Sequence, residues 1–232
     1  MNRRTFTLIA LLLGFSAVWQ TQADDAKTPY PHMAPLDQYL MERDAEVALA
    51  RSAAPDSVSR DAEVLVLGQH GYETAVKGKN GFVCIVERSW MTQPDDPEFW
   101  NPKMRGPACF NAAAARFNVP VDIKKTESIL AARSNIQMAE DMKVALDKKE
   151  FPALEPGAMC YMMSKQGYLN DRGGHWEPHL MFLVPQTNAA AWGANLDASP
   201  IYALEDKLDR YTLFLVPIAK WSDGTWAHGD GH

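Results

Sequence analysis

The order of two hydrophobic periodicities along the chain constrains its fold more than any other feature. Strand-like runs occupy residues 62–87, a helical period covers residues 121–149, and strand-like runs return over residues 158–221. Strands and helices that are segregated in this way are typical of α+β domains. We therefore predict a single globular α+β domain over residues 36–221. Its sheet should be mainly antiparallel, with about five to seven strands and a helical segment inserted in the middle of the chain.

The first group of strands contains one buried strand and one expected hairpin. Residues 62–67 are almost entirely aliphatic, which is typical of a strand buried on both faces. Residues 72–76 and 82–87 flank the dipeptide Asn80-Gly81. Asn-Gly between two strand-like runs is a strong hairpin signal, because both residues tolerate the positive φ angles of a tight turn. We therefore expect these two runs to pair with each other.

Two regions of the chain favour long helices. Residues 36–53 carry apolar side chains at helical spacing, and Pro55 should end that helix. Residues 121–149 follow the helical period over a longer stretch. Within them, Ser134 and Gln137 have the spacing of a capping box, in which each residue bonds the backbone of the other. The second region is therefore expected to contain two consecutive helices.

Residues 91–106 interrupt the regular pattern with three prolines and two adjacent aromatic side chains. A loop of this length inside a compact domain is usually functional or mobile. A short helix is expected over residues 107–117, because proline suits the first turn of a helix. Beyond the helices, residues 158–164 and 179–184 look like partner strands, and residues 211–221 form a further extended run.

Residues 1–23 have the features of an export signal and not of a folded element. Arg3 and Arg4 precede an uncharged run of twelve residues, 8–19, and the segment ends in a small-x-small pattern. Twelve apolar residues are too few to cross a bilayer, which needs about 20. The paired arginines fit the twin-arginine route as well as the general secretory route. We expect an exported protein, periplasmic or secreted, with no transmembrane segment after cleavage.

The two ends of the mature chain look less regular than its middle. Residues 24–35 contain three prolines and little pattern, so they are expected to form an N-terminal tether. Residues 222–232 are rich in glycine and are expected to form a flexible C-terminal tail. Once Arg3 and Arg4 are removed, the chain carries 21 basic and 29 acidic side chains. Such a surface repels phosphate backbones, which argues against a nucleic-acid partner.

The three cysteines leave several pairings open. Cys84, Cys109 and Cys160 all belong to the mature chain, and an oxidising compartment favours one disulfide among them. Three buried free thiols are the alternative. Cys109 also lies near an expected helix N-terminus, where the helix dipole would lower its pKa. That position would suit a nucleophile if His70 or His175 approached it.

Three segments resemble a family of uncharacterised exported bacterial proteins that has no assigned activity. They are residues 71–90, from Gly-Tyr-Glu to a tryptophan, residues 155–185, which begin Glu-Pro-Gly, and residues 216–225, which begin Val-Pro. Together they span most of the mature chain. The resemblance implies export and a single domain. It supplies no catalytic residues.

A His-Trp-Glu-Pro-His sequence is the sharpest candidate for a metal site. Pro178 excludes a regular helix, and in an extended segment His175, Glu177 and His179 would point to one face. Two imidazoles and a carboxylate suit Zn²⁺ or Fe²⁺. His70 follows a buried strand and could complete such a site. A solvated strand start with both histidines exposed is the alternative.

Aromatic side chains suggest a second kind of site. Phe99, Trp100 and Trp176 could form the wall of an apolar ligand pocket, although tryptophans also serve as packing anchors. No complete catalytic signature accompanies them, so the sequence does not decide whether the protein is an enzyme. The leading hypothesis is a non-catalytic module that binds an unknown small molecule or protein. A metal-dependent, hydrolase-like enzyme that uses residues 175–179 is the alternative.

Overall fold

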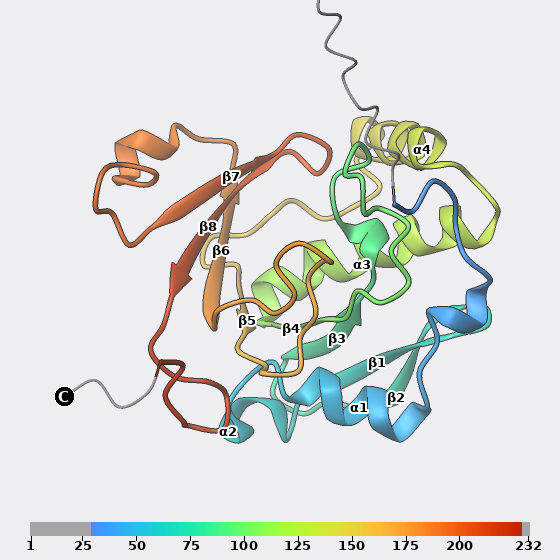
Figure 1. Ribbon diagram of the computed structural model, residues 1–232. Coiled ribbons are helices and arrows are strands. Elements are labelled where there is room, and N and C mark those ends of the chain that lie inside the picture. The colour runs from blue at the N-terminus through green and yellow to red at the C-terminus, as the bar shows by residue number, and fades with distance from the viewer. Residues whose placement is uncertain (1–28, 229–232) are drawn as a thin grey trace, which may run out of the picture.

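The computed structural model describes residues 29–228, which are built around an eight-stranded sheet (Figure 1). The strands follow the order β2-β1-β3-β4-β5-β6-β8-β7, and all neighbours are antiparallel except β1 and β3. Their bounds are β1 Glu63–Gly68, β2 Gly71–Val76, β3 Val83–Glu87, β4 Gly106–Phe110, β5 Met159–Met162, β6 His179–Pro185, β7 Tyr202–Asp206 and β8 Tyr211–Pro217. The α+β class and the mainly antiparallel sheet are confirmed. The expected number of strands was too low.

The α-helices of residues 29–228 occur at two places in the chain and not only in its middle. The helices of this part of the chain are α1 Arg43–Arg51, α2 Asp56–Ser59, α3 Ala112–Leu130, α4 Asn135–Asp147 and the short 3-10 helices η1 Leu36–Gln38, η2 Ser89–Met91 and η3 Ala189–Trp192. Within the described residues, η1, α1 and α2 precede β1, and α3 and α4 connect β4 to β5. No helix of the described residues is long and apolar enough to cross a membrane.

Alternating side chains of the first four strands pack into two separate clusters. One cluster joins α1 to β1, β3 and β4, and its buried members include Val64, Val66 and Cys84. The intervening residues Leu65 and Leu67 belong to the larger cluster beneath α3 and α4. Because successive side chains of a strand point to opposite faces, α1 and α3 cover opposite sides of the same strands. This half of the sheet is therefore a three-layer structure.

The expected hairpin between residues 72–76 and 82–87 is wrong. The strand β2 pairs with β1 through the two-residue turn between Gly68 and Gly71, whereas β3 lies on the other side of β1 and runs parallel to it. Asn80 does form a local turn, because its side chain accepts a hydrogen bond from the amide of Phe82 at 3.1 Å. That turn lies in the segment that connects β2 to β3, and this segment passes the start of β1. The Asn-Gly signal identified a turn but not its strand partners.

The expected helix over residues 107–117 is also partly wrong. Residues 106–110 form β4, which pairs with β3 on one side and β5 on the other. The helix α3 begins only at Ala112, where the Asn111 side chain accepts a hydrogen bond from the amide of Ala114 at 2.9 Å. Asparagine is among the best helix N-caps. The local cap, and not Pro107, therefore fixes where this helix starts.

The two consecutive helices expected over residues 121–149 are confirmed with different bounds. The capping box formed by Ser134 and Gln137 is present at the start of α4. Because the chain breaks its helical phase between α3 and α4, one apolar stripe does not run through both. Ile136, which such a stripe would bury, is 74% exposed, whereas Met138 and Met142 are fully buried.

The C-terminal half of the sheet is covered differently on its two faces. The expected partnership of residues 158–164 with 179–184 is confirmed by the antiparallel pair β5 and β6. On one face, Trp192 of η3 stacks on Phe214 of β8, with ring centroids 4.9 Å apart. The opposite face carries alternate residues of β6, β8 and β7 and bounds the cavity described below.

Parts of both expected terminal segments make ordered contacts. Tyr30 and Met33, from the expected tether, pack against the cluster beneath α3. Lys220 pairs with Trp226 in an isolated β-bridge, so residues 222–226 turn back toward the domain. The expected export signal, residues 1–23, residues 24–28 of the expected tether and the last four residues of the expected tail lie outside the described residues.

Candidate functional site

The candidate site is a cavity of about 360 Å³ beneath α3. Its floor is one face of the C-terminal half of the sheet, formed by side chains of β6, β8 and β7. The segments that follow β3 and β5 supply further walls. Its apolar lining consists of Met91, Met104, Phe110, Met162, Leu169, Trp176, Met181, Leu183, Leu204, Leu213 and Leu215. The volume and the mainly apolar lining of this cavity are typical of pockets that bind small molecules.

One face of α3 brings polar groups to this apolar cavity. Asn118, Asp122 and Lys125 are spaced at four and three residues, so they lie on one face of the helix, and all three are buried. Lys125 donates a hydrogen bond to the buried carboxylate of Asp209, with Nζ and Oδ2 2.6 Å apart. This ion pair ties α3 to the connection between β7 and β8. This ion pair therefore connects α3, which covers the cavity, to the strands that form its floor.

Several buried polar atoms at this cavity have no hydrogen-bond partner in the protein. Seven such side-chain atoms occur within residues 29–228, and four belong to residues that line the cavity. These four are Asn118 Oδ1, Asp122 Oδ2, Asp209 Oδ1 and Trp176 Nε1. A buried polar atom without a partner costs free energy unless water or a ligand satisfies it. Their concentration around one cavity distinguishes it from a gap in packing.

The carboxyl groups of the cavity titrate abnormally. Burial raises the pKa of Glu87 to about 7; the ammonium of Lys125 opposes this shift and the carboxylate of Asp209 adds to it. Burial also raises the pKa of Asp122 well above its usual range, and Glu87 adds to that rise. Because its pKa is about 7, Glu87 is divided between its two forms at neutral pH. Strongly shifted groups in a cavity are typical of functional sites.

The lysine of the buried pair remains charged despite its burial. Burial lowers the pKa of Lys125, but Asp209, Asp206 and Asp122 together outweigh that effect, and the pKa is raised. Five acidic residues line the cavity, namely Glu87, Asp96, Asp122, Asp206 and Asp209, against one lysine, Lys125, and one histidine, His179. Acidic side chains therefore outnumber basic ones in this lining. The cavity therefore favours cations and hydrogen-bond donors over anions.

His179 is the one histidine of the expected metal site that lines this cavity. Its Nδ1 lies 2.7 Å from the carbonyl oxygen of Glu177. A carbonyl oxygen can only accept, so Nδ1 carries the proton and Nε2 keeps its lone pair. Burial lowers the pKa of His179, so the neutral ring is favoured. Its ring packs edge-on against Trp176, with centroids 6.0 Å apart.

The other expected ligands do not converge on His179. His175 is exposed, and its Nδ1 contacts the carbonyl oxygen of Gly167 at 2.6 Å. Glu177 is exposed and lies 3.4 Å from His228, and His70 is exposed in the turn between β1 and β2. Within residues 29–228, no group of three or more histidine, cysteine, aspartate or glutamate side chains is arranged to hold a metal ion.

The three aromatic residues expected to form one pocket wall are separated. Trp176 lines the cavity beneath α3. Phe99 is buried and packs edge-on against Trp100, with ring centroids 4.7 Å apart. Trp100 lines a different hollow, beside the turn between α3 and α4. Phe99 and Trp100 serve mainly as packing anchors for the irregular segment that contains them.

The cysteines are resolved into one disulfide and one free thiol. Cys84 of β3 and Cys109 of β4 are directly opposite in the sheet and form a disulfide. Cys160 of β5 is buried and free, and burial raises the pKa of its thiol well above the usual value. Cys109 lies in a strand and not at a helix N-terminus. Because its sulfur is bonded to that of Cys84, Cys109 cannot act as the nucleophile that the sequence suggested.

Most residues of the cavity were not identified from the sequence. Asn118, Asp122 and Lys125 do form a polar stripe at helical spacing, but such a stripe is usually a solvated helix face. Glu87 is a single acidic residue at the end of a strand. Only the sheet topology shows that the connection between β7 and β8 brings Asp209 to the cavity that Glu87 also lines.

Comparisons of this chain with known protein families, with curated proteins and with solved structures give no match.

Proposed function

We propose that the protein binds a small, largely apolar molecule that carries a protonated amine or another hydrogen-bond donor, in the cavity beneath α3. One observation carries this proposal, namely the group of four buried polar atoms without protein partners around one cavity. Three are oxygen atoms and one is the indole nitrogen of Trp176. A ligand that brings donors complements such a set best.

The apolar lining supports the same class of ligand. Met91, Met104, Met162 and Met181 supply flexible thioether side chains that adapt to ligands of different shape. The leucines of β6 to β8 offer a flat apolar floor. A molecule with an apolar body and one cationic end would place its body on this floor. Its ammonium group would then lie near Asp122, Asp209 and Glu87.

We also propose that the protein acts outside the cytoplasm, as the apparent signal in residues 1–23 predicts. The disulfide between Cys84 and Cys109 supports this proposal, because disulfides persist mainly in oxidising compartments. The resemblance to uncharacterised exported bacterial proteins is consistent with it.

A matched set of three probes tests the binding proposal. Octylamine, octan-1-ol and octanoate share one apolar chain and differ only in charge. Isothermal titration at pH 8, where Glu87 is ionised and the amine is still protonated, should show octylamine binding most tightly to this cavity. Glu87→Gln should weaken octylamine binding about tenfold, since a close opposite charge contributes about 1–2 kcal/mol in a partly buried site.

Glu205→Gln is the control for that variant. Glu205 is an exposed carboxylate on the opposite face of β7, so its removal changes the net charge equally without altering the cavity. Octylamine binding should be the same in Glu205→Gln as in the unaltered protein. Absence of octylamine binding at millimolar concentration, or equal weakening in both variants, would refute the proposal.

A further inference from the structure

A second pocket lies on the other side of Tyr211 from the cavity beneath α3. It has a volume of about 460 Å³ and is lined by residues of α3, the end of α4, the segment that follows α4, and the β7–β8 connection. Its apolar members are Phe117, Leu146, Phe151, Pro152, Ala153, Leu154, Pro185 and Tyr211, and its charged members are Lys149, Asp209 and Arg210. Asp209 and Tyr211 line both pockets.

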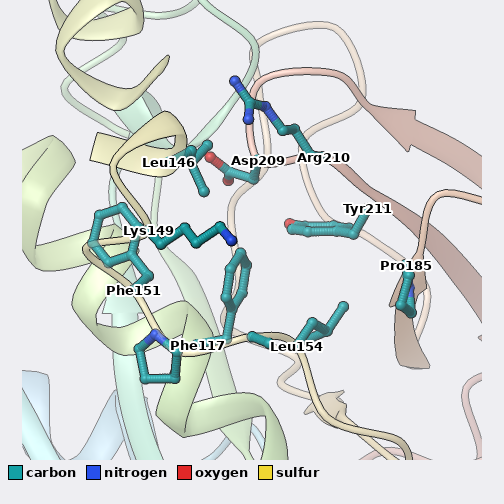
Figure 2. Close-up of a pocket in the computed structure, with 11 residues that line it drawn as sticks. Phe117, Leu146, Lys149, Phe151, Leu154, Pro185, Asp209, Arg210 and Tyr211 are labelled. Atoms are coloured by element: carbon teal, nitrogen blue, oxygen red, sulfur yellow. The ribbon is translucent and has the colours of Figure 1, made fainter. Parts of the chain in front are cut away.

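Two polar groups face the interior of this pocket from opposite sides. Figure 2 shows the side chain of Lys149 extending inward past Phe117, and the hydroxyl group of Tyr211 pointing toward it across the pocket. Within the described residues, neither the Lys149 ammonium nor the Tyr211 hydroxyl has a hydrogen-bond or ion-pair partner. Burial, together with nearby acidic groups that include Asp209, raises the pKa of Tyr211, so its hydroxyl stays a donor.

The charges around the pocket leave one cation uncompensated. Asp209 is paired with Lys125, with nitrogen and oxygen 2.6 Å apart. Arg210 is paired with Asp147 at the same distance. Of the three charged residues that line this pocket, only Lys149 has no ion-pair partner among residues 29–228. The pocket therefore combines apolar walls with a single positive charge and a phenolic donor, which is the reverse of the charge pattern of the cavity beneath α3.

We propose that this second pocket binds a small apolar carboxylate. The carboxylate would contact Lys149 Nζ and the Tyr211 hydroxyl, and the apolar body would lie on Phe117, Phe151 and Leu154. Medium-chain fatty acids and arylalkanoic acids both fit this description. Such a ligand satisfies both polar groups at once, whereas an alcohol leaves the ammonium unpaired and an amine is repelled by it.

Octanoate is the probe for this site, with octan-1-ol as the uncharged comparison. Isothermal titration at pH 8 should show octanoate binding with a 1:1 stoichiometry and more tightly than octan-1-ol. Lys149→Asn should weaken octanoate binding about tenfold, because it removes the charged hydrogen-bond donor that faces the carboxylate. Asparagine suits this position, because the φ angle of Lys149 is +55°. Lys149→Arg should retain most of the binding.

Three controls place the probe and separate this proposal from the previous one. Lys148→Gln removes an exposed neighbouring lysine that does not line the pocket, and octanoate binding should be unchanged. Glu87→Gln alters only the cavity beneath α3 and should weaken octylamine but not octanoate. Thermal unfolding of Lys149→Asn should match the unaltered protein, since the residue is exposed. Octanoate binding that survives Lys149→Asn, or that is no tighter than that of octan-1-ol, would overturn the inference.

Discussion

Lys125 and Asp209 form an ion pair that is almost completely buried, with Nζ 2.6 Å from Oδ2 and the two side chains only 2% and 3% exposed. The pair joins α3 to the connection between β7 and β8, two elements separated by more than 80 positions in the chain. It also stands between the two pockets, because Asp209 lines both and Lys125 lines the cavity beneath α3. The pair therefore matters both for stability and for the polar ends of both sites.

Removing one member of this pair should destabilise the protein strongly. Lys125→Met leaves the Asp209 carboxylate buried without its counter-charge, so we expect the free energy of unfolding to fall by about 3–5 kcal/mol. Lys165→Met, which breaks the exposed pair with Asp223, should cost less than about 1 kcal/mol. Urea unfolding of the two variants gives the comparison. If Lys125→Met is no worse than Lys165→Met, the pair is not buried as described.

The raised pKa of Glu87 predicts a pH dependence of stability with a definite sign. Its ordinary pKa is 4.5 and its folded pKa is about 7, so between these values the folded state binds more protons than the unfolded state. The contribution of Glu87 to the free energy of unfolding must then fall as pH rises from about 4.5 to 7. The Glu87→Gln substitution should therefore leave the free energy of unfolding almost unchanged at pH 4.5 and raise it at pH 8. A stability difference between the two proteins that does not change over this range would contradict the assignment.

The disulfide should contribute measurably to stability. Cys84 and Cys109 are separated by 25 residues, and closing a loop of that length is worth about 3–4 kcal/mol through the unfolded state. Cys84→Ala with Cys109→Ala should lower the free energy of unfolding by that amount. A thiol assay in denaturant should find one free thiol, that of Cys160, before reduction and three afterwards. Three thiols before reduction in protein recovered from an oxidising compartment would contradict the pairing.

The mass of the mature protein tests whether residues 1–23 are removed on export. Protein recovered from the cell envelope or the medium should lack about the first 23 residues, because the small-x-small pattern ends at Ala23. Intact-mass spectrometry measures this difference directly. A control with Arg3 and Arg4 both changed to Asn should accumulate in uncleaved form, because the positive start of the signal is lost. Recovery of the unaltered protein with Met1 retained would count against export.

Secondary structure that depends on local patterns was predictable from this sequence. The buried strand over residues 62–67 and the capping box of Ser134 and Gln137 depend on hydrogen bonds and apolar periods that are local in the chain. Their positions in the structure differ by only one or two residues from those expected. The pairing of residues 158–164 with 179–184 was also recovered, because both runs are strongly apolar and the sheet is mainly antiparallel.

Strand partners and the candidate site were much less predictable. The strands β1 and β3 pair in parallel, and β2 lies at the edge of the sheet on the other side of β1. No local sequence signal encodes this arrangement. Asp209 reaches Lys125 because β8 pairs with β6 as well as with its sequential neighbour β7. The polar stripe on α3 has the period of a solvent-exposed face. Its burial follows from the tertiary packing of the sheet, which periodicity cannot anticipate.

The crossover between β2 and β3 supplies the last prediction. Gly78 lies so close to the start of β1 that a Cβ atom there would be 2.3 Å from the backbone nitrogen of Glu63. Backbone atoms cannot yield as a flexible side chain can, so Gly78→Ala should displace the crossover and cost about 1–3 kcal/mol. Gly68→Ala is the comparison, because the nearest atom to a Cβ there is 3.5 Å away. In the hairpin that the sequence suggested, residue 78 would occupy an open turn and tolerate alanine. Unfolding measurements that find Gly78→Ala no more destabilised than Gly68→Ala would therefore favour the hairpin over the parallel pairing of β1 and β3.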